Sequence, residues 1–308
     1  MVSRRRQHER PQVHLIDGHV YLFRAYYALP EMTAPDGTPI GATYGFANTL
    51  LKYLSGRAIS HVALCFDWAM ESFRNELFPL YKATRGAPPD DLVLQFGLCG
   101  EVARALGVPV FEQKHYEADD LIATLAAELV SQGADVVVVT GDKDLAQLVR
   151  EDASVVLYDL ARDATLDARG VRAKFGVDPE QIPDYLGLVG DAADNLPGVP
   201  GVGPRSASAA LQAFGVIESI PADPRAWVGV PVRGAARIAR SIDCHRAQAL
   251  RVRALATVER AVPGLRCRLE DLAYRGAHRD RVAPLFERLG LRGIGARVPR
   301  WQDGGAAP

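Results

Sequence analysis

The sequence predicts an α/β fold in which helices flank a mostly parallel central sheet. Between residue 13 and about residue 160, strand-like apolar runs alternate with helical patterns, which is typical of parallel sheets. Three of these runs lead into an acidic residue, which places carboxylates along one rim of the sheet. After about residue 165 the strand-like runs stop, and short helical segments broken by Gly and Pro predict a smaller helical subdomain.

Four strands and two clear helical patterns are expected in the first half of the chain. The strands are 13–16, 62–66, 136–139 and 155–158, and the helical patterns are 45–54 and 121–125. Asp17 and Asp67 directly follow the first two strands, and Asp142 and Asp144 come shortly after the third. Ligands of parallel sheets bind beyond the carboxyl ends of the strands, so these four side chains are expected to converge.

The composition is that of a globular protein. Of the 308 residues, 48% are hydrophobic and 24% are charged, which permits one large core or two domains. No apolar run approaches the roughly 18 residues of a membrane span, and the arginine-rich start lacks the apolar core of a secretory signal. The four cysteines show no C-x-x-C spacing, which indicates reduced thiols. A cytoplasmic location is therefore expected.

Two further acidic clusters lie where helices are expected to begin. They are Glu117-Ala118-Asp119-Asp120 and the segment 190–195, which contains Asp191 and Asp194. A single aspartate after a strand is usually a helix cap or a turn residue. Several acids from independent segments at one rim are harder to explain as caps, and they would repel one another without cations. Oxygen ligands without His or Cys indicate Mg²⁺ or Mn²⁺. Two such ions, about 4 Å apart, are the usual apparatus of phosphodiester hydrolysis, so a nuclease is the leading interpretation.

The stretch 231–260 is basic, although the whole chain carries a net charge of −1. Its arginines include Arg233, Arg237 and Arg240, and only Asp243 and Glu259 oppose them. The spacing of these three arginines places them on one helix face, which suits a phosphate backbone bound without reading its sequence. The alternative for any single charge run is a solvated helix face.

Seven segments together resemble the 5′-nuclease, or flap endonuclease, family. They are Ile-Asp-Gly-His at 16–19, Cys-Phe-Asp at 65–67, Ser-Phe-Arg at 72–74, Tyr-Lys-Ala-Thr-Arg at 81–85, Tyr-Glu-Ala-Asp-Asp at 116–120, Thr-Gly-Asp-Lys-Asp-Leu at 140–145 and Gly-Asp-Ala-Ala-Asp-Asn at 190–195. The resemblance covers residues 13 to 295 and is greatest to the 5′→3′ exonuclease domain of bacterial DNA polymerase I. Because no polymerase-like segment follows in the sequence, a free-standing form is expected.

The resemblance implies a PIN-like, 5′-nuclease fold with two functional parts. An α/β metal-binding domain is expected at 11–165, with a helical arch at about 68–95. A helical DNA-binding subdomain is expected at 166–300, with a helix-hairpin-helix at about 186–215. Residues 1–10 and 301–308 are expected to be disordered tails.

The resemblance also assigns roles to the acids and to the arch. Asp17, Asp67, Glu117 and Asp119 would surround one metal ion, and Asp120, Asp142, Asp144 and Asp191 the other, with Asp194 in an outer shell. In the arch, Lys82 and Arg85 would neutralise charge on the scissile phosphate. Arg74 would hold either the DNA strand or the arch itself. Phe23 would stack on a base or pack in the core.

The helix-hairpin-helix is expected around 198–207, where glycines let backbone N–H groups approach a phosphate. Gly201, Gly203, Arg205 and Ser206 would contact DNA there, and relatives bind K⁺ through carbonyl groups of this element. Pro204-Arg205-Ser206 stands where the family usually has Glu-Lys-Thr. The cation and the hydroxyl are kept while an acid is lost, and Pro suits the first helical position.

The function implied is that of a structure-specific 5′→3′ exonuclease and 5′-flap endonuclease in RNA-primer removal and DNA repair. The expected partners are branched or nicked duplex DNA and unidentified replication or repair proteins. A monomer associated with the nucleoid is expected. A non-catalytic DNA-junction binder and a metal-dependent PIN-type ribonuclease are the alternatives.

Overall fold

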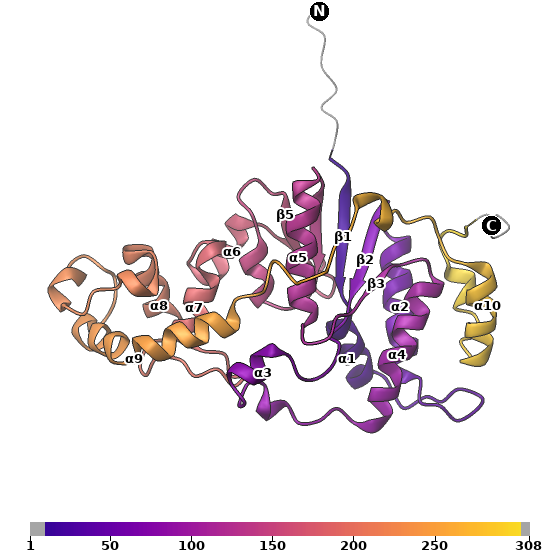
Figure 1. Ribbon diagram of the computed structural model, residues 1–308, viewed down its shortest axis with the longest axis horizontal. Coiled ribbons are helices and arrows are strands. Elements are labelled where there is room, and N and C mark those ends of the chain that lie inside the picture. Colours follow the sequence, from indigo (N-terminus) through magenta and orange to yellow (C-terminus); the bar gives the residue numbers. More distant parts are fainter. Residues whose placement is uncertain (1–9, 303–308) are drawn as a thin grey trace, which may run out of the picture.

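The computed structural model describes residues 10–302, and a six-stranded sheet lies at the centre of the molecule (Figure 1). The strands are β1 Gln12–Asp17, β2 His61–Cys65, β3 Val110–Phe111, β4 Asp135–Val139, β5 Val155–Asp159 and β6 Ala164–Leu166. Their order in the sheet is β3-β2-β1-β4-β5-β6, and only β6 runs antiparallel to its neighbour. The predicted mostly parallel α/β fold is confirmed.

Helices cover both faces of this sheet and continue into a second region. The helices are α1 Gly18–Ala28, α2 Gly41–Ser55, α3 Phe73–Leu77, α4 Asp90–Ala105, α5 Ala118–Ser131, α6 Ala168–Phe175, α7 Ile182–Val189, α8 Pro204–Phe214, α9 Ala235–Ala256 and α10 Arg279–Arg288. In Figure 1, α2 and α4 lie on one side of the sheet and α5 on the other, while α6 to α9 extend beyond α5. The helical region predicted after about residue 165 is therefore present.

The sheet is buried on both faces, which explains the continuous apolar runs of its strands. Along β4, Val136 and Val138 belong to the core under α5, whereas Val137 and Val139 belong to the core under α2 and α4. This alternation follows from the period of two along a strand. The two expected helical patterns lie within α2 and α5.

The four expected strands are present, and two short strands were not anticipated. β3 has two residues and β6 has three, so neither is long enough to show an apolar run. Both lie at the edges of the sheet, where a strand has only one neighbour.

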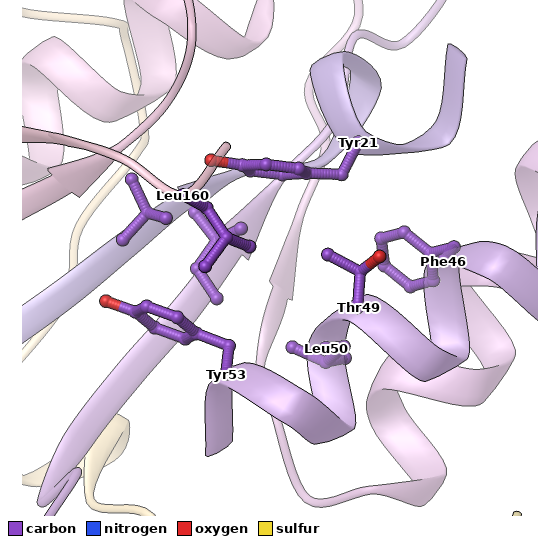
Figure 2. Close-up of a pocket in the computed structure, with 8 residues that line it drawn as sticks. Tyr21, Phe46, Thr49, Leu50, Tyr53 and Leu160 are labelled. Carbon is purple, nitrogen blue, oxygen red and sulfur yellow. The ribbon is translucent and has the colours of Figure 1, made fainter. Parts of the chain in front are cut away.

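The core between the sheet, α1 and α2 is tightly filled. Tyr21, Phe46, Leu50, Tyr53 and Leu160 line a cavity of only about 10 Å³ (Figure 2). That space is about the size needed for one water molecule. This cavity is too small for a substrate, whereas ligands of parallel sheets bind at the carboxyl ends of the strands.

After α9 the chain returns across the molecule to the opposite side of the sheet. Residue Ala273 bridges to His61 at the start of β2, and α10 then packs near α4. Of the expected tails, residues 1–9 and 303–308 lie outside the described residues. Trp301 belongs to the folded part, because it bridges to Ala277 and lies under the guanidinium of Arg279.

Within residues 10–302, none of the helices combines the length and the apolar character needed to cross a membrane.

Candidate functional site

The carboxyl ends of β1, β2 and β4 bring Asp17, Asp67 and Asp142 to one rim. Asp17 ends β1 and caps α1, and its carboxylate accepts hydrogen bonds from the Thr140 hydroxyl at 2.8 Å and from the Val20 amide at 3.4 Å. Asp67 follows β2 and accepts a 2.6 Å hydrogen bond from the amide of Ala118, at the start of α5. Strand β1 lies between β2 and β4, so the rim is the switch point of the sheet topology, where ligands of such folds bind.

Several of these acids are held in surroundings that disfavour their charge. Burial raises the pKa of Asp17 to about 7, and the charges of Asp67 and Asp142 contribute. Burial, together with Asp142 and Asp17, raises the pKa of Asp119 well above its ordinary range. Burial and the neighbouring Asp142 likewise raise the pKa of Asp144 to about 8. Added positive charge would stabilise this cluster.

The donor set fits hard divalent cations. It consists of carboxylate oxygens, and one of them, Oδ1 of Asp144, is buried without a hydrogen-bond partner in the part of the chain that the structure describes. Within that part, no three His, Cys, Asp or Glu side chains form a ready-made ligand shell. Water and phosphate oxygens would have to complete it, as is usual for Mg²⁺.

Three other acids of the predicted set are already paired with cations. The Lys82 ammonium lies 2.9 Å from Oε2 of Glu117, and Lys143 lies 2.5 Å from Oδ2 of Asp191. Arg85 pairs with Asp194. Burial alone would raise the pKa of Glu117, but Lys82 and Arg74 outweigh it and hold that pKa below its ordinary value.

The segment predicted to form the arch lies over this rim. It contains α3, a turn at Ala83–Arg85 and the start of α4. Lys82 has the left-handed backbone conformation, with φ of 55°, and its amide donates to the Asp194 carbonyl at 3.0 Å. Such a conformation is uncommon outside glycine and is often found at functional sites.

A cleft of about 430 Å³ separates the arch segment from the rim. Lys82 and Arg85 line it from the arch, and Asp67, Glu117 and Asp142 line it from the rim.

Phe23, on α1, forms part of the cleft wall and also packs partly buried against Phe96, with ring centroids 5.9 Å apart. Both roles considered for Phe23 are thus compatible with its position.

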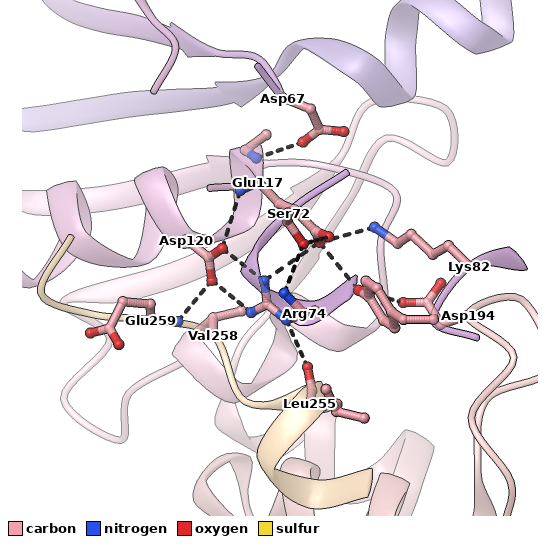
Figure 3. A network of polar contacts seen from close by, with 12 residues as sticks. Asp67, Ser72, Arg74, Lys82, Glu117, Asp120, Asp194, Leu255, Val258 and Glu259 are labelled. Atoms are coloured by element: carbon pink, nitrogen blue, oxygen red, sulfur yellow. Dashed lines mark hydrogen bonds and ion pairs between the residues drawn. The ribbon is translucent and has the colours of Figure 1, made fainter. Parts of the chain in front are cut away.

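Two expectations are corrected by a buried ion pair. The resemblance predicts that Asp120 binds metal and that Arg74 contacts DNA. In the structure these two side chains bind each other instead. Two guanidinium nitrogens of Arg74 lie 2.7 and 2.8 Å from the two carboxylate oxygens of Asp120 (Figure 3). Arg74 is 2% exposed and Asp120 is fully buried. Arg74 therefore holds the arch segment, which was the second role considered for it.

The predicted helix-hairpin-helix corresponds to α7, the loop 190–203 and α8. Pro204 occupies the first turn of α8, as expected, and Arg205 is exposed beside it. Gly201 has a φ of 75°, and a Cβ atom at this position would lie 2.5 Å from a guanidinium nitrogen of Arg237. The fold thus brings Arg237, from α9, next to the hairpin loop.

The expected helix face with three arginines is not formed as predicted. Arg237 and Arg240 belong to α9, but Arg233 precedes the helix, because Gly234 turns the chain with a φ of 72°. Glycine is unfavourable inside a helix, and α9 begins only after Gly234. Arg233 therefore does not share a helix face with Arg237 and Arg240.

Part of the basic stretch is structural. Arg253 pairs with Asp184 and Glu218, Arg246 donates to the carbonyls of Ile217 and Ile220, and Arg260 donates to the carbonyl of Gln147.

Three polar side chains at the site were not anticipated. The buried Tyr81 hydroxyl lies 3.2 Å from Oε2 of Glu117 and 3.1 Å from Oδ2 of Asp194, so its one proton can be donated to either carboxylate. The Ser72 hydroxyl donates to Glu117 at 2.8 Å. Tyr81 directly precedes Lys82, and Lys143 lies between two predicted ligands. All three residues lie inside segments that carry the family resemblance, and their membership of those segments is the sequence signal that points to them.

Comparison with known families matches two consecutive segments of the chain. Residues 12–176 match the 5′-3′ exonuclease, N-terminal resolvase-like domain, and residues 177–280 match the 5′-3′ exonuclease, C-terminal SAM fold.

Similar curated proteins include two bacterial DNA polymerases. DNA polymerase I of Bacillus caldotenax is 38% identical over 283 residues, which cover 90% of this chain and 31% of that protein. DNA polymerase I of Pseudomonas aeruginosa is 40% identical over 276 residues, which cover 89% of this chain and 30% of that protein. The chain thus spans about a third of the length of these relatives.

Among solved structures, T5 5′-exonuclease with bound divalent metal ions (zinc) has a TM-score of 0.65 at 18% identity, covering 81% of this chain and 90% of that one. The catalytic core of Rad2 in complex with DNA substrate has a TM-score of 0.59 at 14% identity, covering 94% and 90%. These similarities show a shared fold. Because both family segments match in order over most of its length, the chain belongs to the 5′-3′ exonuclease family.

Proposed function

We propose that this protein is a divalent-metal-dependent, structure-specific 5′→3′ exonuclease and 5′-flap endonuclease acting on DNA. One observation carries the proposal: Asp67, Glu117 and Asp142 face Lys82 and Arg85 across a single cleft. Behind them lie the buried carboxyl groups of Asp17 and Asp144, whose pKa values are raised by burial and by the charge of Asp142. Phosphodiester hydrolysis of this kind uses carboxylates that bind metal ions and positively charged side chains that hold the phosphate. The cleft brings both together.

The acids divide into two groups in this proposal. Asp17, Asp67, Glu117 and Asp119 would hold one Mg²⁺ or Mn²⁺ ion, and Asp142, Asp144 and Asp191 the other, with Asp194 in an outer shell. When bound, the two ions would lower the pKa of the attacking water and stabilise the leaving oxygen. Asp120 is left out because Arg74 occupies both of its carboxylate oxygens.

Lys82 and Arg85 would change partners when substrate arrives. Each is paired with an acid here, Lys82 with Glu117 and Arg85 with Asp194. A scissile phosphate in the cleft would compete for both cations, which would hold it and neutralise its developing negative charge. The products would carry a 5′-phosphate and a free 3′-hydroxyl.

Duplex DNA would bind through the helix-hairpin-helix and the start of α9. The loop containing Gly201 and Gly203 would approach a phosphate closely, and Arg205, Ser206 and Arg237 lie around it. A K⁺ ion bound by carbonyl groups of this loop belongs to the proposal. Exposed Arg233 and Arg240 would add sequence-independent phosphate contacts. Phe23 would stack on a base near the cut.

We place this activity in RNA-primer removal and DNA repair, on nicked or 5′-flapped duplex DNA. A cytoplasmic monomer at the nucleoid, with replication or repair proteins as partners, completes the proposal.

Product mapping on a 5′-flap duplex, labelled at each end in turn, tests this function. Asp142→Ala should abolish cleavage in Mg²⁺ or Mn²⁺ while duplex binding stays largely intact, because a carboxylate that repels DNA is removed. Lys82→Ala should slow cleavage by about 10² to 10³, the usual effect of removing one charge-stabilising group.

Two exposed positions serve as controls. Asp152→Ala, in the turn before β5, and Lys174→Ala, on α6, alter exposed side chains and should cut at the wild-type rate. Retained cutting by Asp142→Ala would refute the metal assignment. Tight binding to the DNA junction without cutting would favour a non-catalytic DNA-junction binder. Preference for single-stranded RNA, without salt-sensitive binding to duplex DNA, would favour a metal-dependent PIN-type ribonuclease.

A further inference from the structure

Arg74 lies at the point where three distant segments of the chain meet. Its side chain comes from α3 in the arch segment, Asp120 comes from the first turn of α5, and the third segment is the end of α9. The Nε of Arg74 donates to the Leu255 carbonyl at 2.8 Å (Figure 3). An Nη of Arg74 donates to the Thr257 carbonyl at 3.1 Å. With the two bonds to Asp120, four of the five guanidinium N–H groups are engaged.

This contact fixes the carboxyl-terminal end of α9. The last carbonyls of a helix lack partners within the helix and carry partial negative charge, so a buried cation is favourable there. Asp120 also accepts the Glu259 amide at 2.8 Å, which holds the chain just beyond α9. The end of α9 is thereby joined to the arch segment and to α5 at once.

The other end of α9 contacts the hairpin loop. Arg237 lies beside Gly201, and the Ser241 hydroxyl donates to the Pro200 carbonyl at 2.6 Å. Further along α9, the Gln248 amide donates to the Gly198 carbonyl at 3.2 Å. At 1.5 Å per residue the 22 residues of α9 span about 33 Å, so one rigid element connects the hairpin with Arg74.

Helix α3, which carries Arg74, is linked to Lys82 by hydrogen bonds from two neighbours of Arg74. Asn75, also in α3, donates from its side chain to the Tyr81 carbonyl at 3.0 Å. Ser72, which caps α3, donates to Glu117, the partner of Lys82. The position of α3 therefore sets where Lys82 meets the acidic rim.

We propose that Arg74 is a positioning residue that couples α9, and therefore duplex bound at the hairpin, to the placement of Lys82. Arg74 touches neither DNA nor the reacting atoms in this proposal. It acts by holding the base of the arch against the end of α9, so that binding on the hairpin orders the arch over the rim. The proposal rests on the proposed nuclease function, and part of its test is independent of cleavage.

Arg74→Lys keeps the charge but cannot form both bonds to Asp120 together with the bond to Leu255. At saturating 5′-flap substrate its single-turnover cleavage rate should fall at least tenfold, while the Kd for duplex stays within twofold of wild type. Arg172→Lys, which alters a paired but exposed arginine on α6, should leave both quantities unchanged. An unchanged rate, or a Kd weakened as much as the rate, would overturn the proposal.

A double-mutant cycle separates positioning from general destabilisation. In a Lys82→Ala background, with rates followed over hours, Arg74→Lys should reduce cleavage less than twofold further, because its effect passes through Lys82. Fully additive losses would show that Arg74 acts by another route and would overturn the assignment.

Hydrogen–deuterium exchange provides the readout that does not need cleavage. Binding of duplex without divalent ions should slow exchange in residues 72–82 of the wild type, and Arg74→Lys should abolish this slowing while protection of 204–214 remains. Unchanged slowing in the variant would refute the coupling. If the wild type does not cleave DNA but duplex binding still slows exchange in residues 72–82, the proposed nuclease function is wrong and the coupling through Arg74 stands.

If Arg74→Lys unfolds below the assay temperature, the double variant Arg74→Gln with Asp120→Asn, which removes both charges of the ion pair, replaces it. The same changes in rate, Kd and exchange are expected of it.

Discussion

Adjacent residues Asp119 and Asp120 occupy opposite electrostatic environments. Asp120 is buried against the guanidinium of Arg74, which neutralises it with two hydrogen bonds. Asp119 is held near the charges of Asp142 and Asp17, and Lys82 only partly offsets them. The first acid stabilises the fold, whereas the second is available to a cation.

Replacing each by asparagine should therefore have different consequences for stability. Asp120→Asn leaves a buried arginine without its counter-charge, and breaking such a pair lowers the free energy of unfolding by about 3 kcal/mol. Asp119→Asn removes a like charge from the rim, so the free energy of unfolding should stay the same or rise, while cleavage is lost. Urea denaturation without divalent ions measures the first effect, and the flap assay measures the second.

Equal destabilisation by the two asparagine variants would contradict this division. Loss of stability by Asp119→Asn alone would show that the roles of the two residues are reversed.

The rim itself could be predicted from sequence, but this division could not. Parallel strands with a two-residue period fix which ends carry Asp17, Asp67 and Asp142, whatever the details of packing. Asp119 and Asp120 both lie in the first turn of one helix, and only the rotation of that helix decides which faces the rim. The partner that settles it, Arg74, is 46 residues away.

The buried His14 predicts a loss of stability in mild acid. Burial, with a contribution from Arg57, lowers the pKa of His14 to about 4, and its Nδ1 lies 2.7 Å from the Tyr53 hydroxyl. Between pH 6.5 and about 4 the unfolded chain binds a proton at His14 and the folded chain does not. The free energy of unfolding should therefore fall by roughly 3 kcal/mol as pH falls through this window.

His14→Gln can still bond to Tyr53 but does not titrate. Urea denaturation at pH 7 and pH 4.5 should show a smaller difference for this variant than for wild type. Identical pH dependence would mean that His14 does not contribute.

At the scale of elements, the hairpin loop depends on one glycine. Gly201→Ala would strain a backbone with φ of 75° and would displace the Arg237 side chain, which lies 2.5 Å from the new Cβ position. Losing one charged hydrogen bond to a phosphate should weaken duplex binding about tenfold. The salt dependence of binding should decrease by about one phosphate contact. Fluorescence anisotropy over a range of salt concentrations measures both.

Gly133→Ala is the matched control for backbone strain. Gly133 has a φ of 87° at the end of α5, and nothing lies within 4 Å of the position of its Cβ. This variant should lose stability like Gly201→Ala and keep full affinity for duplex. Equal weakening of binding by both variants would show that strain, rather than displacement of Arg237, is responsible.

Element bounds were predictable where a pattern was long. The runs of β1, β2, β4 and β5 and the periodicity of α2 and α5 are each set by many apolar residues. The start of α9 was misjudged because the arginine spacing suggested a helix that Gly234 interrupts. Charged residues on a surface constrain a helix less than buried apolar ones do, since no packing fixes their register.

At the scale of the whole molecule, the core under α5 continues into the helical region. Leu121 and Leu125 of α5 belong to the same buried cluster as Leu186 and Leu188 of α7 and Ile242 of α9. The core on the opposite face includes Val282 and Phe286 of α10. Both faces of the sheet are therefore completed by residues beyond 176, where the first matched family segment ends.

The full chain should consequently unfold as one cooperative unit. Calorimetry without divalent ions should show a single transition, with a calorimetric enthalpy close to the van't Hoff enthalpy. A fragment ending at residue 176 should give no such transition. It lacks the side chains of α7, α9 and α10 that bury the α5 face and the α4 face, and each of them contributes about 1.5 to 3 kcal/mol to the free energy of unfolding. For the five side chains beyond residue 176 named above, the loss is roughly 8 to 15 kcal/mol, which is as large as the roughly 5 to 15 kcal/mol by which folded domains are stable. Two separate transitions, or a folded fragment, would show that the sheet domain is stable without the helical region. In that case the contact of Arg74 with the end of α9 would be the main link through which duplex binding could affect the arch.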